Sequence, residues 1–170
     1  ANEETTYTIP DGIETIYPYA FSNNQYLETL NIGKDTTTIY VNSIANLPAL
    51  QSINVDLENT YYKSFDGVLY ENIHGTTPQL YGLLRYPENK PGETYAVIEE
   101  TNFIDRNAFS YNKNLTEIIF NDTLESVSPF AFFGVENLLI LDFPASLDNI
   151  IGFFTQSLNP LVNKRDFLFT

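Results

Sequence analysis

The sequence predicts a solenoid of 23-residue repeats, with a parallel β-sheet on one face and short helical or 3₁₀ turns opposite. Three observations lead to this prediction. A pattern of apolar residues returns at a fixed interval, each copy ends in a strand-like motif, and a stretch of different composition interrupts the series as an inserted antiparallel β-meander. The fold class is therefore α/β or mainly β, depending on whether the turns are helical.

The repeat is clearest in residues 104–120, which read IDRNAFSYNKNLTEIIF. The spacings 39 − 16, 127 − 104 and 150 − 127 all equal 23 residues, whereas 104 − 39 equals 65, one period plus 42 residues. Self-similarity of this kind predicts a solenoid of about five coils, the last being a worn copy from Ile150 to Leu161. The apolar positions of the four regular copies are Ile16, Ala20, Phe21, Leu27, Leu30 and Ile32; Ile39, Ser43, Ile44, Leu50, Ile53 and Val55; Ile104, Ala108, Phe109, Leu115, Ile118 and Phe120; Val127, Ala131, Phe132, Leu138, Leu141 and Phe143.

Each copy ends in L-x-x-Φ-x-Φ, where Φ is apolar, and this alternation is typical of a strand with one buried face. A short strand cannot bury its face alone, so stacked copies are expected to form a parallel sheet with strands about 4.8 Å apart. The Ala-Phe pair earlier in each copy, such as Ala108-Phe109, indicates one helical or 3₁₀ turn on the opposite wall. The second copy has Ser43-Ile44 in its place.

The 42 extra residues map to an insertion at residues 56–97, between the second and third repeats. Residues 61–70 predict a hairpin around Asp66-Gly67, because this pair tolerates the positive φ of a tight turn. A third strand is expected at residues 79–86, and residues 95–98 return the chain to the next repeat. The meander is expected to pack on the flank of the solenoid.

The units IPDGIETIYPYAFSNNQYLETLNI and IDRNAFSYNKNLTEIIF, with the intervening NTYYKSFDGVLYENIHGTTPQLYGLLRYPENK, resemble leucine-rich repeat proteins of the BspA type. That family has a repeat with an Ala-Phe pair, and often an S-x-D-G-V-L-Y hairpin followed by a short strand ending in Y-P. The resemblance covers most of residues 8–143. It implies that residues 1–170 form a single leucine-rich repeat domain. It also implies a bacterial protein, secreted or on the cell surface, that binds host or matrix proteins or neighbouring cells.

The composition narrows the possible partners and compartments. A chain of 170 residues with 43% hydrophobic content and no cysteine can bury the core of one domain without disulfides or metals. Its net charge of −14 repels phosphate backbones, so nucleic acid is not an expected partner. This charge either keeps the protein soluble or attracts cations or a basic partner, and the scattered positions of the acids favour the first interpretation.

Direct membrane insertion is not expected, because the sequence has no run of about 20 apolar residues. The N-terminal stretch ANEETTYTIP lacks the basic and apolar regions of a signal peptide. The sequence also begins without Met, so it is expected to be a segment of a longer chain.

Motifs for catalysis and cofactor binding are missing from the sequence, which contains no H-E-x-x-H, P-loop or G-x-G-x-x-G. The single histidine, His74, lies in the Gly- and Thr-rich stretch ENIHGTTP and is expected to be an exposed loop residue. A glycosidase needs two facing carboxylates in a cleft, an arrangement that the sequence neither places nor excludes. We therefore expect no enzymatic activity, no cofactor and no metal site.

Binding is the expected function, because the exposed positions of stacked strands can vary without disturbing the core. Ile119 and Ile140 favour contact over a plain solvated sheet face, since two apolar side chains on adjacent exposed positions form a small patch or are covered by a terminal segment. The tyrosines of the insertion are expected to pack on the sheet as structural residues; if the insertion instead binds a ligand, Tyr62 and Tyr81 are the candidates. The candidate positions on the concave face are Thr29, Asn31, Ser52, Asn54, Glu117, Ile119, Ile140 and Asp142.

Three functions are compatible with these observations. The first, which the resemblance implies, is a non-catalytic extracellular module for adhesion to host or matrix proteins. The second is a structural or spacer module attached to a catalytic or anchoring domain. The third is a carbohydrate-binding domain that uses the Tyr-rich insertion.

Overall fold

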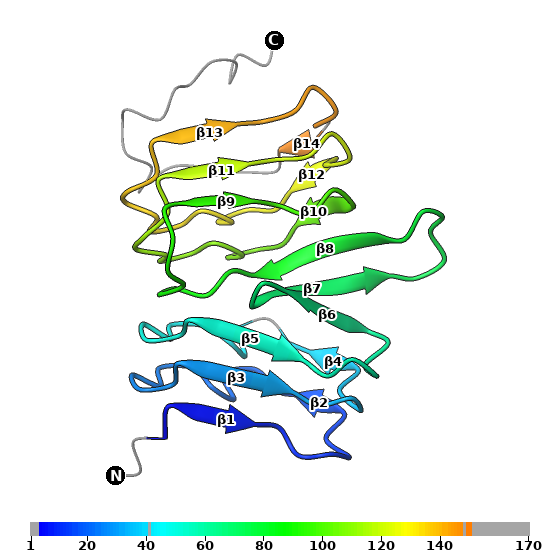
Figure 1. The fold of residues 1–170 in the computed structure, drawn as a ribbon, viewed down its shortest axis with the longest axis vertical. Coiled ribbons are helices and arrows are strands. Elements are labelled where there is room, and N and C mark those ends of the chain that lie inside the picture. Colours follow the sequence, from blue (N-terminus) through cyan, green and yellow to red (C-terminus); the bar gives the residue numbers. More distant parts are fainter. Residues whose placement is uncertain (1–3, 41, 148, 151–170) are drawn as a thin grey trace.

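The computed structural model describes residues 4–40, 42–147 and 149–150, which form a β-solenoid wound along one long axis (Figure 1). The described residues contain no helix, and therefore none that could span a membrane. The strands are β1 (Thr6–Thr8), β2 (Thr15–Ile16), β3 (Thr29–Ile32), β4 (Thr38–Ile39), β5 (Ser52–Val55), β6 (Tyr62–Phe65), β7 (Val68–Ile73), β8 (Leu80–Arg85), β9 (Thr94–Ala96), β10 (Thr101–Ile104), β11 (Glu117–Ile119), β12 (Ser126–Val127), β13 (Ile140–Asp142) and β14 (Asn149–Ile150).

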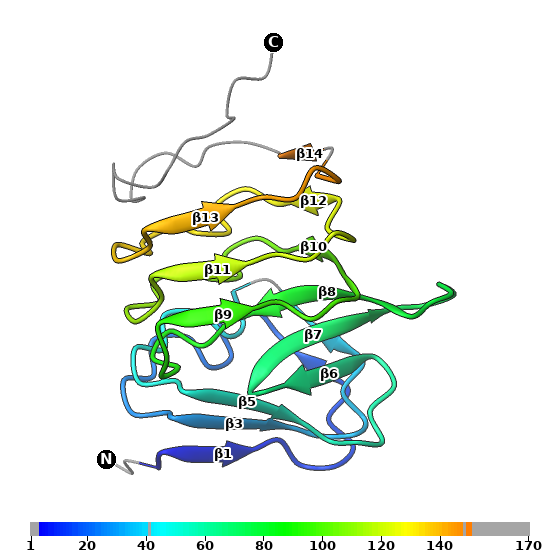
Figure 2. The ribbon, with the colours of Figure 1, turned by 45° about the horizontal axis from the view of Figure 1, so that its top comes forward.

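One wall of the solenoid is a stack of parallel strands (Figures 1 and 2). β1, β3 and β5 pair in that order in the first half, and β9, β11 and β13 pair in the second half. Residues 23 apart lie opposite each other, as in Asn31, whose side chain reaches Thr8 on one side and Asn54 on the other. The predicted parallel sheet and repeat period are therefore confirmed. β1 precedes the first predicted copy and adds a strand to it.

The opposite wall is also a sheet, which the repeat pattern did not predict. The first apolar residue of each copy lies in a short strand, and within each half it pairs with its equivalent in the next copy, as in Ile16↔Ile39 and Ile104↔Val127. β-branched residues favour the extended backbone that such pairing requires. Val127 also pairs with Ile150, so the predicted fifth copy begins in register, and the rest of it lies outside the described residues.

The segment with the Ala-Phe pair, here called the outward turn, is closed by i→i+3 hydrogen bonds such as Ser110 N to the Asn107 carbonyl (3.1 Å). The predicted 3₁₀-type turn is therefore confirmed, and the helical alternative is wrong. In the third copy, Asn107 and Tyr111 have φ values of 60° and 61°, in the left-handed region. A left-handed residue on either side of the turn prevents it from continuing into a helix. The equivalent pairs in the other copies are Tyr19 and Asn23, Asn42 and Asn46, and Phe130 and Gly134.

The meander lies between the two halves of the solenoid, and its predicted place on the flank is wrong (Figure 2). β6, β7 and β8 pair antiparallel, and β8 then pairs in parallel with β10. Val68 and Tyr70 pack in the core of the second half, whereas Leu69 packs in the core of the first half. Because successive side chains of a strand point to opposite faces, β7 separates the two cores.

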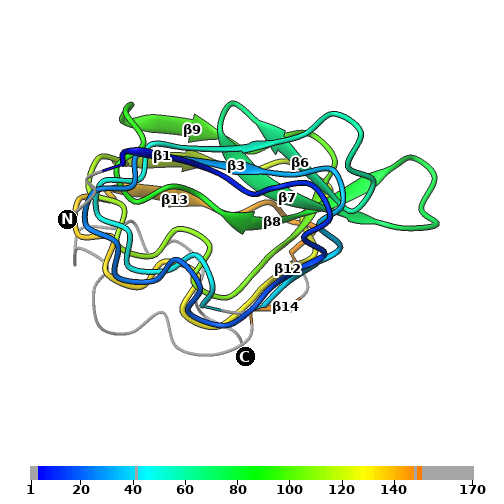
Figure 3. The ribbon, with the colours of Figure 1, turned by 90° about the horizontal axis from the view of Figure 1, so that it is seen from below.

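Polar contacts also join the two halves where the meander meets β5. The Gly67 carbonyl accepts a hydrogen bond of 2.9 Å from Ile53 N, and the Leu50 carbonyl accepts one of 2.8 Å from Asn89 N. The turn between β7 and β8, which holds His74, projects beyond the outline of the coils (Figure 3). His74 is exposed, and its ring meets the edge of Tyr61 at 5.3 Å, so the expected loop position is confirmed.

Buried asparagines tie one coil to the next. The Asn112 side chain accepts hydrogen bonds from the backbone N–H groups of Asn114 (2.9 Å) and Leu115 (2.8 Å) and donates one to the Pro87 carbonyl (2.9 Å). Asn59 makes the same kind of contacts from the second coil. These residues satisfy backbone groups that the tight corners leave without strand partners.

We expect Asn112→Ala to lower the free energy of unfolding by about 1–3 kcal/mol, because it leaves buried backbone groups without hydrogen-bond partners. Urea unfolding followed by circular dichroism measures the change. Asn137→Ala is the matched control, since Asn137 is exposed and its side chain donates one hydrogen bond, to the Lys113 carbonyl. Equal losses for the two variants would contradict this role of Asn112.

Candidate functional site

The predicted binding positions lie on the outward side of β3, β5, β11 and β13, here called the strand face. Thr29, Asn31, Ser52 and Glu117 are half-buried, whereas the other four are exposed: Asn54, Ile119, Ile140 and Asp142. The meander separates the positions of the first half from those of the second (Figure 2). The two groups differ in character.

The first half of the strand face is a ladder of polar side chains that bind one another. Asn54 donates a hydrogen bond of 2.9 Å to Asn31 Oδ1, and Asn31 donates one of 2.9 Å to Thr8 Oγ1. Ser52 Oγ donates one of 3.0 Å to Asn54 Oδ1. Hydrogen bonds between coils thus occupy much of the polar capacity of this group, which gives it a structural role.

The second half of the strand face combines apolar and acidic side chains. Ile119 pairs with Asp142, and Ile140 pairs with Glu117, so the two isoleucines are diagonal neighbours. Both isoleucines are 49% exposed. Diagonal neighbours on a sheet are within reach of long side chains, so Ile119 and Ile140 together form a small apolar patch flanked by two carboxylates.

Tyr62 and Tyr81 do not form an exposed platform on the insertion. Tyr62 is only 6% exposed, which agrees with the expected packing role and contradicts its place on a candidate binding surface. Its hydroxyl accepts a hydrogen bond of 3.0 Å from Ile39 N and donates one of 3.3 Å to the Thr37 carbonyl. In this way Tyr62 caps the free edge of β4, where the next coil would otherwise pair. Tyr81 is half-buried, with its ring against Phe65 at 5.3 Å.

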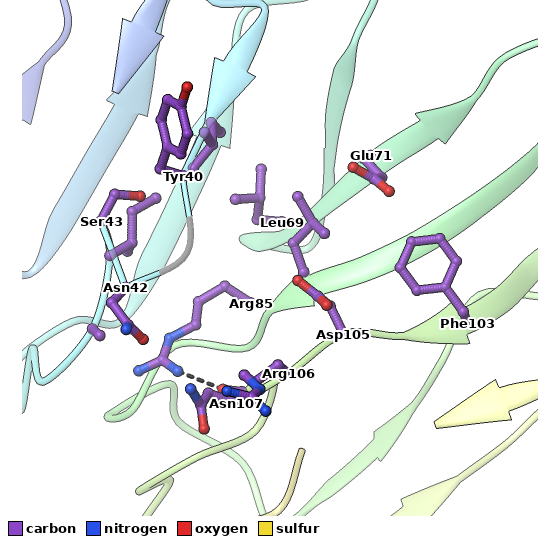
Figure 4. A pocket seen from close by; sticks show the side chains of 14 residues that line it. Tyr40, Asn42, Ser43, Leu69, Glu71, Arg85, Phe103, Asp105, Arg106 and Asn107 are labelled. Atoms are coloured by element: carbon purple, nitrogen blue, oxygen red, sulfur yellow. Dashed lines mark hydrogen bonds between the residues drawn. The ribbon is translucent and has the colours of Figure 1, made fainter. Parts of the chain in front are cut away.

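A cleft that sequence reasoning missed lies between the two halves, on the side of the outward turns (Figure 4). It comprises two adjoining cavities of about 160 Å³ and 310 Å³, which share Asn42, Ala45, Arg85 and Asn107. We call it the junction cleft. Its other lining residues are Ile39, Tyr40, Ser43, Ile44, Asn46, Leu69, Glu71, Leu84, Phe103, Asp105, Arg106, Ser110, Tyr111, Phe130 and Phe133.

An ion pair buried at the base of the junction cleft fixes the position of Arg85. Its guanidinium donates hydrogen bonds to the Glu88 carboxylate and to the Asn107 carbonyl, the second of which is drawn in Figure 4. Arg85 is 5% exposed and Glu88 is 1% exposed. At this depth neither charge is stable without the other, because each would have lost its hydration without compensation.

Two further carboxyl groups line the junction cleft, and burial alters both pKa values. Burial raises the pKa of Glu71 above its ordinary 4.5, and the charge of Asp105 raises it further. Burial also raises the pKa of Asp105 above 3.8, although hydrogen bonding and the charge of Arg106 oppose this. The two carboxyl groups therefore hold their protons more tightly in the folded protein than in the unfolded chain. As pH rises from the ordinary pKa values to the raised ones, the two groups lower the free energy of unfolding.

We expect the variant Glu71→Gln/Asp105→Asn to gain stability over the native chain as pH rises from about 4 to 7, with little difference at the acid end. Urea unfolding at a series of pH values measures the difference between the two chains. The comparison isolates the two carboxyls from the general effect of net charge. A difference that stays constant across this range would contradict the raised pKa values.

A family of repeat proteins matches most of the chain. The profile of the BspA type leucine-rich repeat region matches six copies, over residues 2–73 and 94–159. Comparison with curated proteins gives no match. The profile match omits residues 74–93, which include β8 and the turn before it, so the second part of the insertion departs from the repeat.

Solved structures with the same fold include two bacterial proteins that are each 25% identical to this chain. A leucine-rich repeat protein from Eubacterium ventriosum aligns with a TM-score of 0.72, over 85% of this chain and 37% of that protein. The pneumococcal vaccine antigen PcpA aligns with a TM-score of 0.69, over 85% of this chain and 40% of that protein. The chain thus spans well under half the length of either protein.

A third structure shares the fold at lower identity. It is a leucine-rich cell surface protein from Faecalibacterium prausnitzii, 19% identical, with a TM-score of 0.54 over 86% of this chain and 49% of that protein. The strand register, the repeat period and the profile match over both halves agree with one another. The chain therefore belongs to the BspA-type leucine-rich repeat family.

Proposed function

We propose that this chain is a non-catalytic binding module of a bacterial cell-surface protein, and that it binds a host or matrix protein through the second half of the strand face. The observation that carries the proposal is the exposed apolar patch of Ile119 and Ile140. An apolar patch ringed by polar residues is typical of protein-binding surfaces. The surface location of a structural relative is consistent with this role.

The strand face suits a protein partner because its backbone does not depend on the exposed side chains. Ile118 and Leu141 are buried and hold β11 and β13 in place, so substitutions at the neighbouring outward positions leave the core intact. Glu117 and Asp142 border the patch, where charges select a partner and affect its rate of association.

We expect Ile119→Ser and the charge reversals Glu117→Lys and Asp142→Lys each to weaken binding to an immobilised panel of matrix proteins by about tenfold. Biolayer interferometry on purified protein measures the affinities. Leu57→Ser and Glu136→Lys are matched controls, because both residues are exposed and neither belongs to β11 or β13. Saturable binding that none of the three variants changes would exclude the strand face as the site.

The spacer function makes the opposite prediction in the same assay. A spacer would retain no protein from the panel, and neither the patch variants nor the controls would alter any signal. Saturable binding that Ile119→Ser weakens and Leu57→Ser leaves unchanged would therefore exclude a purely structural role.

A further inference from the structure

The junction cleft exists because one outward turn is missing from the stack. Elsewhere the turns of adjacent coils bind each other, as in Phe21 N to the Ser43 carbonyl (3.0 Å) and Phe109 N to the Ala131 carbonyl (2.8 Å). The meander passes from β8 directly through Tyr86, whose N–H donates a hydrogen bond of 2.7 Å to the Ala108 carbonyl, and makes no outward turn of its own. The turn at residues 42–46 is thus separated from the turn at residues 107–111.

Arg85 replaces the missing turn only in part. The Asn107 carbonyl accepts from the Arg85 guanidinium, whereas the equivalent Asn42 carbonyl accepts from the backbone N–H of Tyr19. Within the described chain, Arg85 Nε and Ser43 Oγ are buried without a hydrogen-bond partner. Ser43 is 1% exposed, and both residues line the cavity of about 160 Å³. Buried polar atoms in native proteins are rarely left unpaired, so both atoms have hydrogen-bonding capacity that the protein itself does not use.

The charges around the cleft favour a neutral ligand. Arg85 and Arg106 lie on the same cavity as Glu71 and Asp105, so an anion would meet two carboxylates and a cation would meet two guanidinium groups (Figure 4). The mixture of donors and acceptors suits hydroxyl groups, which both donate and accept hydrogen bonds.

Aromatic rings at the rim provide the apolar part of such a site. Tyr40, Tyr111 and Phe130 are exposed and line the two cavities. Binding sites for small molecules combine apolar walls with a few fixed polar groups, and a sugar ring has the matching composition of C–H faces and hydroxyl edges. An added peptide strand fits less well, because the Tyr62 hydroxyl already occupies the backbone groups of Thr37 and Ile39 at the free edge of β4.

We propose that the junction cleft binds a short neutral saccharide, whose hydroxyl groups reach Ser43 Oγ and Arg85 Nε and whose ring packs against the aromatic rim. The site uses the meander, through Glu71 of β7 and Arg85 of β8, but it does not use Tyr62. It lies apart from the strand face, and therefore this proposal does not depend on the protein-binding role.

The test begins with an array of neutral, anionic and cationic glycans probed with the purified full chain. Each saccharide that the array retains is then titrated into the native chain and into four variants, and saturation-transfer NMR measures the affinities. Ser43→Ala should weaken binding about tenfold without lowering the melting temperature, because its hydroxyl stabilises nothing in the free protein. Ala45→Trp should abolish binding, because Ala45 lines both cavities and an indole there obstructs the place where they meet. Tyr111→Ala should weaken binding, whereas Tyr26→Ala, an exposed tyrosine outside the cleft, should not.

Retention of neutral saccharides that Ser43→Ala and Ala45→Trp reduce would support the proposal. Three outcomes would overturn it: no glycan retained on the array, retention of charged glycans alone, or saccharide affinity that Ala45→Trp leaves unchanged. Binding of unmodified peptides without any saccharide would likewise replace the proposed ligand class with another.

Discussion

Replacing Phe109 with alanine is expected to lower the free energy of unfolding by about 3–5 kcal/mol. The Phe109 side chain is fully buried, and its ring stacks on those of Tyr86 and Phe132, each at 5.4 Å. Alanine would leave a cavity between these two rings, which would lose their contacts on one side. Because Tyr86 belongs to the insertion, the cavity would also weaken the contact between the meander and the repeats. Urea unfolding followed by circular dichroism measures the loss.

Phe130→Ala is the control for this variant, since Phe130 occupies an outward turn and is exposed. Its loss should stay below about 1 kcal/mol, in the range of surface substitutions. A loss below about 1 kcal/mol for Phe109→Ala would show that the Ala-Phe position is not part of the core.

The repeat pattern was enough to predict the sheet and most of the core. Leu27, Leu30, Leu50 and Ile53 are buried as predicted, because the L-x-x-Φ-x-Φ spacing fixes which side of a strand each residue takes. The same spacing identified Ile119 and Ile140 as exposed positions. Local periodicity is sufficient wherever each coil repeats the contacts of its neighbour.

The prediction for the outward turns left a helix open, because a small residue beside a large one also occurs in helices. The better signal was asparagine at matching positions, in Asn42 and Asn107 and again in Asn46, since asparagine tolerates the left-handed conformation. Tyr111 and Phe130 also adopt this conformation, and neither residue type indicates it. At these positions the contacts between coils override the local preference.

The role of the insertion depended on contacts that periodicity does not describe. Tyr62 was a candidate for a binding surface, yet its hydroxyl replaces the missing backbone partner of β4. Tyr86 extends the column of rings that Phe109 and Phe132 form. Locating the junction cleft would have required the observation that the 42 extra residues complete a coil without an outward turn.

Replacing Glu88 with leucine is expected to lower the free energy of unfolding by about 3–5 kcal/mol, because it leaves the Arg85 charge buried without its partner. Leucine removes every acceptor of the carboxylate while filling a similar volume. The Glu88 backbone carbonyl keeps its hydrogen bond from Lys113 N, so the change acts on the side chain alone. Urea unfolding measures the loss.

The double variant Arg85→Met/Glu88→Leu separates the cost of an unpaired charge from the value of the pair itself. Replacing both charges with apolar groups of similar volume removes the buried charge altogether, so we expect most of the lost stability to return. Asp66→Asn breaks the ion pair of Lys90 with the exposed Asp66 carboxylate (3.0 Å), and keeps a residue that tolerates the turn. That control should cost at most about 1 kcal/mol. A double variant as unstable as Glu88→Leu would mean that Arg85 stabilises the junction through its hydrogen bond to the Asn107 carbonyl, and not through charge pairing.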